Sequence, residues 1–192
     1  MGELIDAPSP EGRILLIEPR RLAAKAAATR LAQSIGEPVG KRVGYSVRNE
    51  QKRSDATSIE AITDGLFLRR LQSQPDLPGV AIVIFDEFHE RRRDSDVALA
   101  LLREARQLLR PDLKLLLMSA TLQLESLSAQ FEGADTLTSQ GRAFPVETRH
   151  SPARHQERLE THVLRVIEEE VRELEDNRHA GEAPPGVLVF LP

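Results

Sequence analysis

The chain has 192 residues and a formal net charge of -4, with 40% hydrophobic and 29% charged residues. This composition is ordinary for a folded protein, and no apolar run approaches the ~18 residues that a membrane-spanning helix needs. Because the chain has no cysteine, a disulfide framework and a thiolate metal site are excluded, and without a secretory signal we expect a cytoplasmic protein with no membrane partner.

The charge is distributed unevenly along the chain. Residues 13–70 contain twelve Lys or Arg and six Asp or Glu, whereas residues 156–182 contain four Arg and nine acidic residues. The basic part could face phosphate groups while the acidic part faces water. Solvated helix faces that differ in sign explain the same pattern, so charge alone does not identify a partner.

The amino-terminal half predicts short strands that alternate with helices. The apolar run Arg13–Ile17 predicts a strand buried on both faces. Small residues at helical spacing between Leu22 and Leu31 predict a helix that ends near Gly36 and Pro38. Two further strands and a short helix are predicted, in chain order, at Val39–Arg48, Ser58–Thr63 and Asp64–Gln72.

The clearest strand is Val80–Phe85, six apolar residues that run directly into acidic residues and a histidine. A helix is predicted at Ser95–Leu109 and a strand at Lys114–Met118, which ends in Ser119, Ala120 and Thr121. Strands alternating with helices indicate βαβ units and a parallel sheet with helices on both faces. In such sheets the chemistry gathers at the carboxyl ends of the strands.

The carboxyl-terminal part gives weaker signals. Strands are predicted at Ala134–Leu137 and Phe144–His150, and an amphipathic helix at Leu159–Leu174 has apolar residues on one face and acids on the others. Residues Ala180–Pro185 read as a linker, and Gly186–Leu191 predicts a further buried strand.

Two acids at the end of a buried parallel strand suit nucleotide hydrolysis. Asp86 can hold a Mg²⁺ ion through water, and Glu87 can orient and deprotonate the attacking water. This is the logic of the Walker B motif. An apolar strand that ends in two acids can also be a strand that simply reaches solvent, and the pair by itself leaves both interpretations open.

His89 completes the sequence Asp-Glu-Phe-His from residue 86, and Ser119-Ala120-Thr121 begins 119 minus 86, or 33, residues later. With these motifs the chain resembles the DEAH-box ATP-dependent helicases of superfamily 2, most closely the bacterial HrpB-type helicases. Four more family motifs occur in the family's order. They are Glu18–Ala24, Val43–Arg48, Thr63–Gly65 and Gly141–Val146.

The resemblance implies a RecA-like α/β fold: a three-layer, doubly wound parallel sheet of a P-loop NTPase helicase domain 1, lacking its first strand and its P-loop. It places a truncated ATP-binding domain at residues 1–150 and a helical connector at 151–185. Residues 186–192 would be the first strand of a second RecA-like domain. The implied partners are the missing P-loop segment and that second domain.

The same resemblance implies roles for individual residues, with ATP and Mg²⁺ as cofactors. Asp86, Glu87 and His89 would be catalytic, with Asp86 and Glu87 holding Mg²⁺ through water. Ser119, Ala120 and Thr121 would couple hydrolysis to movement. RNA or another single-stranded nucleic acid would contact Pro19, Arg20, Arg21, Arg48, Thr63, Asp64 and Gly65. Phosphate contacts of this kind are independent of base identity.

Ordinary structural roles fit several of these residues as well. Arg20 and Arg21 can be a solvated helix end, Ser119 and Thr121 can form a strand-to-helix cap, and His89 can be a loop histidine. A zinc protease is excluded because His89 and Glu90 are followed by arginines, not by a second histidine ligand at the required spacing. This run, Arg91–Arg93, departs from the family's usual Arg-Ser-Leu, and we expect it to face solvent or nucleic acid.

The sequence contains no Gly-x-x-x-x-Gly-Lys-Thr loop, which the family pattern places before the Pro-Arg-Arg motif. We therefore expect a helicase fragment that is inactive alone but couples ATP hydrolysis to nucleic-acid movement in a full-length protein. The alternative is a non-catalytic nucleic-acid-binding remnant of a helicase domain. An unrelated phosphate-binding or response-type α/β protein would leave the arginine and threonine motifs unexplained.

Overall fold

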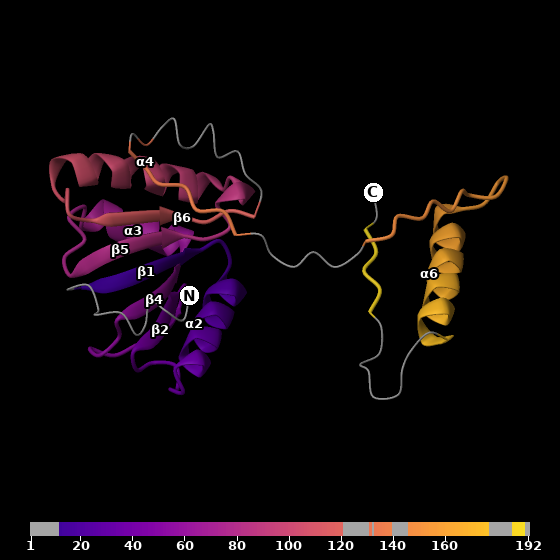
Figure 1. The fold of residues 1–192 in the computed structure, drawn as a ribbon, viewed down its shortest axis with the longest axis horizontal. Coiled ribbons are helices and arrows are strands. Elements are labelled where there is room, and N and C mark those ends of the chain that lie inside the picture. Colours follow the sequence, from indigo (N-terminus) through magenta and orange to yellow (C-terminus); the bar gives the residue numbers. More distant parts are fainter. Residues whose placement is uncertain (1–11, 121–130, 132, 140–145, 177–185, 191–192) are drawn as a thin grey trace. The chain divides into compact units, whose positions relative to one another are not determined.

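The computed structural model describes residues 12–120, 131, 133–139, 146–176 and 186–190. The chain divides into two compact units, 1–136 and 137–192 (Figure 1). The described part of the first unit contains a sheet with helices, and that of the second contains one helix. The sequence-predicted boundary after residue 150 stays a prediction.

A six-stranded sheet forms the first unit, in the order β3-β2-β4-β1-β5-β6. Its strands are β1 (Arg13–Glu18), β2 (Val43–Val47), β3 (Glu50–Lys52), β4 (Ile59–Thr63), β5 (Val80–Phe85) and β6 (Lys114–Leu117). Five strands run parallel, and β3 pairs antiparallel with β2 at one edge. The α/β architecture expected from the alternation of strands and helices is confirmed.

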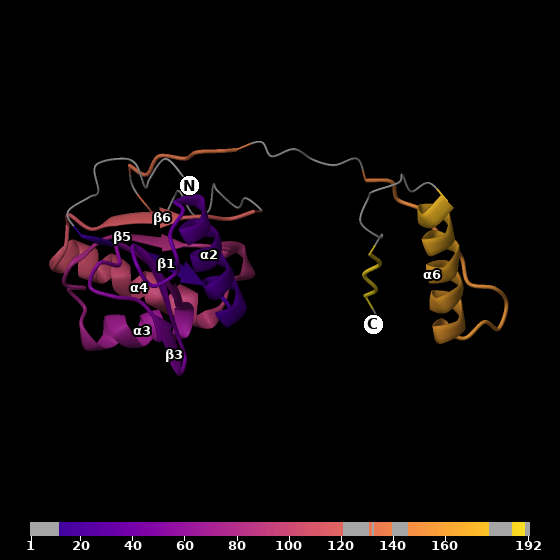
Figure 2. The same cartoon turned by 90° about the horizontal axis from the view of Figure 1, so that it is seen from below.

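Helices cover both faces of this sheet, which gives three layers (Figure 2). Helix α2 (Arg21–Ser34) packs against one face through Ala24, Ala28 and Ala32, whose small side chains let the helix lie close to the strands. Helices α3 (Asp64–Ser73) and α4 (Arg93–Leu108) pack against the other face. The alternation of β1 side chains between the two cores explains why this strand is apolar throughout.

Three aromatic rings connect the α3 and α4 side of the core to the end of β5. Phe67 of α3 lies edge-on to Phe85, with 5.8 Å between the ring centroids, and Phe85 lies edge-on to Phe88 at 6.0 Å. All three side chains are at most 4% exposed. The short 3-10 helix η1 (Phe88–Glu90) is thereby fixed to the core by its first residue.

Near the amino ends of the parallel strands, one buried carboxylate is shared by three arginines. Glu60 is 1% exposed and lies 3.4 Å from Arg13, 3.6 Å from Arg53 and 3.3 Å from Arg70. The Ser46 hydroxyl donates to the same carboxylate at 2.6 Å. A buried charge is tolerated when it is paired and hydrogen-bonded in this way.

The two edges of the sheet differ in character. Strand β3 is short and polar, and its chain passes so close to β2 that a Cβ atom added to Gly44 would lie 2.6 Å from the carbonyl oxygen of Lys52. Strand β6 forms the opposite edge, and Leu116 there is 41% exposed. Among the described residues no strand pairs with the outer side of β6, and an edge of this kind favours association with another strand.

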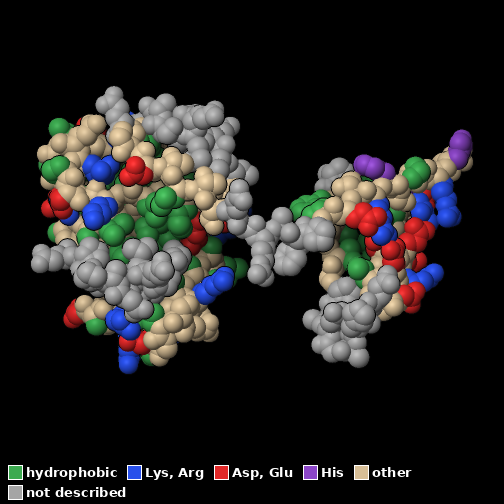
Figure 3. Space-filling model, viewed as in Figure 1, with side chains coloured by type: hydrophobic (Ala, Val, Ile, Leu, Met, Phe, Trp, Pro, Cys, Tyr) green, Lys and Arg blue, Asp and Glu red, His purple; other side chains and the backbone are tan. Residues whose placement is uncertain are grey.

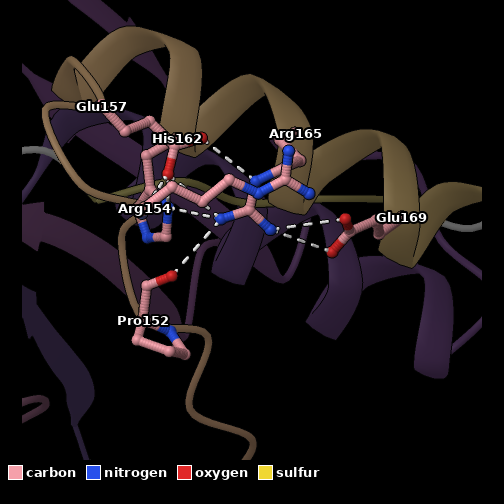
Figure 4. Close-up of polar contacts among 6 residues, drawn as sticks. All are labelled: Pro152, Arg154, Glu157, His162, Arg165 and Glu169. Carbon is pink, nitrogen blue, oxygen red and sulfur yellow. Dashed lines mark hydrogen bonds and ion pairs between the residues drawn. The ribbon is translucent and has the colours of Figure 1, made fainter.

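The described part of the second unit centres on helix α6 (Leu159–Asp176), over which acidic and basic side chains lie together (Figure 3). Arg165 donates to both carboxylate oxygens of Glu157, at 3.1 and 3.2 Å, and to the carbonyl oxygen of Pro152 at 3.4 Å (Figure 4). The backbone N–H of Arg154 donates to Glu157 as well, at 2.7 Å. These contacts, the Arg165 bond above all, lower the pKa of Glu157 to about 2.

Several expected elements differ from the structure. Strand β3 was not expected, because Glu50–Lys52 has no apolar residue. Residues 134–137, 146–150 and 186–190 are not strands, although strands were expected there, and the rest of those predicted strands lies outside the described residues. Within the described part of the chain, no helix has the length and apolar character to cross a membrane.

We expect Gly44→Ala to lower the free energy of unfolding by roughly 1–3 kcal/mol, because the added methyl group must push β3 away from β2. Urea denaturation measures the change. Gly65→Ala is the matched control, since its Cβ would meet only the end of a side chain, Oδ2 of Asp94 at 3.0 Å. Equal free energies of unfolding for the two variants would show that β3 can move away from β2 without loss of stability.

Candidate functional site

The carboxyl ends of the five parallel strands meet at one edge of the sheet, which we call the rim. Pairing of Glu18 with Thr63, of Ile17 with Phe85 and of Phe85 with Leu117 aligns the strand ends. In the order of the sheet, the segments at or directly after these ends are Arg48, Thr63–Gly65, Glu18–Arg21, Asp86–Arg92 and Met118–Ala120. Every described site residue predicted from the sequence therefore lies on the rim, and Thr121 lies outside the described residues.

The acid pair forms the tip of β5. The backbone N–H of Asp86 donates to the carbonyl oxygen of Ile17 at 3.0 Å, and one carboxylate oxygen of Asp86 accepts the N–H of Glu87 at 2.8 Å. Glu87 adopts a left-handed conformation, with φ 50° and ψ 36°. Its side chain is 48% exposed. The sharp turn therefore directs the two carboxylates differently: Asp86 is half-buried and Glu87 faces solvent.

His89 lies between the acid pair and the segment after β6. Its Nδ1 atom is 3.4 Å from a carboxylate oxygen of Glu87 and 3.4 Å from the backbone nitrogen of Ala120. This nitrogen can donate to Glu87 when it carries a hydrogen, or accept the N–H of Ala120 when it does not. The two contacts are alternatives, because one nitrogen cannot donate and accept at the same time. A movement of Glu87 or of Ala120 can therefore change which contact the ring makes.

Glu18 brings a third carboxylate to the acid pair, which the sequence reasoning did not assign. This last residue of β1 is 4% exposed. Burial raises the pKa of Glu18 to about 7, and the nearby charges of Asp86 and Glu87 add to the effect. A carboxyl group at the end of an apolar strand, followed by Pro19, was the available sequence signal.

The basic residues of the Pro-Arg-Arg motif follow β1 and begin α2. Arg20 is the residue before the first turn of α2, and its side chain is 69% exposed. Arg21 and Arg48 are also exposed, whereas Pro19 is buried. A nitrogen of the Arg20 guanidinium lies 2.9 Å from a carboxylate oxygen of Glu90. The predicted phosphate-binding arginine is thus paired with an acid of the β5 tip.

Thr63 and Asp64 are buried at the start of α3, so they do not present exposed side chains on the rim. Asp64 accepts a hydrogen bond from the N–H of Gly65 at 2.7 Å and forms an ion pair with Arg92, also at 2.7 Å. The bond to Asp64 raises the pKa of Arg92 above its ordinary value. Ser95 adds a 3.5 Å contact to the same carboxylate.

Two rim residues, Glu90 and Arg92, were missed by sequence reasoning. They extend from the β5 tip to the turns after β1 and β4, where they pair with Arg20 and Asp64 respectively. Arg92 belongs to the basic run expected to face solvent or nucleic acid. The sequence does not indicate that these oppositely charged residues pair, because they lie in three separate turns. Only the order of the strands in the sheet brings those turns together.

Comparison with known proteins identifies close relatives. The DEAD/DEAH box helicase family model matches residues 2–129. The ATP-dependent RNA helicase HrpB of Escherichia coli strain K12 is 43% identical over 190 residues, which is 99% of this chain and 22% of that protein. The chain therefore spans about a fifth of the length of this curated relative.

Solved structures agree with the sequence comparison. The crystal structure of the Escherichia coli DEAH/RHA helicase HrpB has a TM-score of 0.82 and 43% identity, covering 89% of this chain and 22% of that chain. A crystal structure of the E. coli DExH-box NTPase HrpB has a TM-score of 0.76 at the same identity, covering 89% of this chain and 21% of that one.

Glu18→Gln should stabilise the chain at pH 8 but not at pH 4.5. In the folded state, Glu18 keeps its proton up to about pH 7. The contribution of this proton to the free energy of unfolding is therefore complete below pH 4.5 and is lost as the pH rises through 7. We expect a gain of roughly 1–3 kcal/mol at pH 8 from thermal denaturation in EDTA. Glu50→Gln is the contrasting control, because bonds from Lys25 and Tyr45 lower the pKa of Glu50. A pH-independent effect of Glu18→Gln would contradict the assignment.

Proposed function

The chain belongs to the DEAD/DEAH box helicase family, and from that membership we propose that it is part of the first motor domain of an ATP-dependent RNA helicase. Residues 1–150 would be this domain, 151–185 its helical connector, and 186–192 the first strand of a second domain. We propose a cytoplasmic location. In the full-length protein, this part would couple ATP hydrolysis to nucleic-acid movement.

The observation that carries the proposal is the shared rim. The acid pair after β5 lies beside the segment after β6 on one side and the Arg20 turn after β1 on the other. Ligands of open α/β sheets bind outside the carboxyl ends of the strands. An arrangement with separate edges for the acids and for the Ser119 segment would have excluded a motor.

The donor chemistry at the β5 tip suits Mg²⁺-ATP. Carboxylate oxygens such as those of Asp86 and Glu87 are preferred Mg²⁺ ligands, and this ion commonly keeps several waters and phosphate ligands. Among the described residues, no group of three or more His, Cys, Asp or Glu could hold a metal by itself. Bound Mg²⁺ neutralises charge on the β- and γ-phosphates.

Within this site we assign different tasks to the two acids. Asp86, fixed by backbone hydrogen bonds and half-buried, would hold the ion through water. Glu87, which is exposed on its left-handed turn, would orient the attacking water and accept its proton. The alternative contacts of His89 with Glu87 and Ala120 would carry the state of this site to Ser119, Ala120 and Thr121.

The nucleic acid would bind through exposed arginines around the start of α2. Arg20, Arg21 and Arg48 are exposed on the rim, and within the described part of the chain no side-chain hydrogen bond caps the first turn of α2. Free N–H groups and basic side chains together attract phosphate. The buried residues Pro19, Thr63 and Asp64, with the half-buried Gly65, would shape the neighbouring turns.

A non-catalytic nucleic-acid-binding remnant is the second candidate. The 192 residues themselves contain no Gly-x-x-x-x-Gly-Lys-Thr sequence. Without the amides and the lysine of that loop, an ATP triphosphate loses most of its anion site. Both candidate functions include RNA binding, and a measurement of ATP turnover distinguishes them.

We expect the chain to bind a fluorescein-labelled oligouridylate at low salt, and Arg20→Gln to weaken binding by roughly three- to tenfold. The slope of log affinity against log salt should also fall by about one, because one phosphate contact is lost. Fluorescence anisotropy measures both quantities. The control is Lys114→Gln, which removes an exposed charge at the amino end of β6. Equal losses in both variants would show that binding does not use the rim.

We expect no RNA-stimulated ATP hydrolysis by the 192-residue chain, because the phosphate-binding loop is missing from its sequence. A coupled phosphate-release assay with and without oligouridylate measures turnover. Glu87→Gln serves as the control for contaminating activity and should leave the background unchanged. RNA-stimulated turnover that disappears in Glu87→Gln would refute the expected inactivity.

A further inference from the structure

Arg20, a proposed phosphate-binding residue, has an internal carboxylate partner, Glu90. One guanidinium nitrogen lies 2.9 Å from Oε1 of Glu90, and the two side chains are 69% and 26% exposed. Ion pairs this exposed to water are weak, so an incoming anion can replace the carboxylate. The Arg20 guanidinium is a forked donor that suits carboxylate and phosphate oxygens equally well.

The Asp64–Arg92 pair on the same rim is different. Asp64 has a side chain only 6% exposed, and its carboxylate also accepts from Gly65 and Ser95. Removing Arg92 from a buried carboxylate is costly, so this pair is a permanent part of the fold. Of these two ion pairs between the β5 tip and a neighbouring turn, the exposed Arg20–Glu90 pair is the exchangeable one.

Glu90 is connected to the catalytic tip by a short, constrained turn. Its backbone N–H donates to the carbonyl oxygen of Glu87 at 3.0 Å. Left-handed conformations at Glu87 and Arg91 bound this turn, and such conformations in non-glycine residues persist only where surrounding contacts hold them. The burial of Phe88 is one of these contacts. The exposed Arg20–Glu90 ion pair adds a weaker contact to the same turn.

We propose that Glu90 is a positioning residue that competes with nucleic-acid phosphate for Arg20, so that binding of a strand releases the turn carrying Glu87. This inference rests on the proposed function and adds the route by which the strand is detected. Without nucleic acid, Glu90 holds both Arg20 and the turn in place. With phosphate on Arg20, Glu90 is displaced, and the turn that carries Glu87 loses this one contact while the burial of Phe88 still holds η1 on the core.

Binding of labelled oligouridylate to the 192-residue chain tests the competition. We expect Glu90→Gln to bind about two- to fivefold more tightly than the unaltered chain, since an exposed ion pair no longer has to break. The double variant Arg20→Gln, Glu90→Gln should bind no more tightly than Arg20→Gln. The matched control is Asp112→Asn, which makes the same charge change at the amino end of β6, where Asp112 pairs with Arg110 at 2.7 Å.

Amide hydrogen exchange of the peptide covering residues 86–92 tests the release. RNA should speed exchange in the unaltered chain, and Glu90→Gln should show the faster exchange before RNA is added. A helix-stabilising or packing role alone would not produce this dependence on RNA. Unchanged exchange on RNA binding overturns the proposal.

The outcomes separate this inference from the proposed function. If Arg20→Gln weakens binding but Glu90→Gln does not strengthen it beyond the Asp112→Asn control, competition between Glu90 and phosphate is refuted. The proposed binding of nucleic acid by Arg20 is then still supported. If the unaltered chain binds no RNA at low salt, both are refuted. Thermal denaturation of each variant by circular dichroism verifies that the fold is intact.

Discussion

The rim depends on one constraint, the parallel pairing of β4, β1, β5 and β6. Parallel strands place all their carboxyl ends on one edge, and the pairing of Glu18 with Thr63 and of Ile17 with Phe85 keeps the ends of the central strands within one residue of each other. Segments up to 70 residues apart in sequence therefore become neighbours, as the Arg20–Glu90 contact shows. A strand inserted between β1 and β5 would separate the two charged halves.

Central strand β1 also divides the rim by charge. The acids Glu18, Asp86 and Glu87 gather on the β5 side, and their mutual repulsion is part of the reason that the pKa of Glu18 is raised. Arg48 follows β2 and Arg21 lies near Glu50 of β3, whereas Arg20 reaches to Glu90 of the β5 tip. The proposed function uses this division, with a metal-bound nucleotide on the acidic side and a phosphodiester backbone on the basic side.

Much of this architecture follows from the sequence, because buried parallel strands are apolar throughout. Val80–Phe85 has the predicted bounds, and Lys114–Leu117 is one residue shorter than predicted. The polar edge strand Glu50–Lys52 has no such pattern, since backbone pairing alone defines it. Apolar composition also gave a wrong prediction: residues 186–190 have strand-like composition but are not a strand in the structure.

The left-handed turn at Glu87 restricts which substitutions can report on its carboxylate. A β-branched residue such as valine or isoleucine is strongly disfavoured at φ 50°. Such a replacement would remove the charge and distort the turn together, so a resulting defect could not be attributed to either. Asparagine and glycine tolerate this conformation. They separate the chemistry of the side chain from the shape of the backbone that presents it.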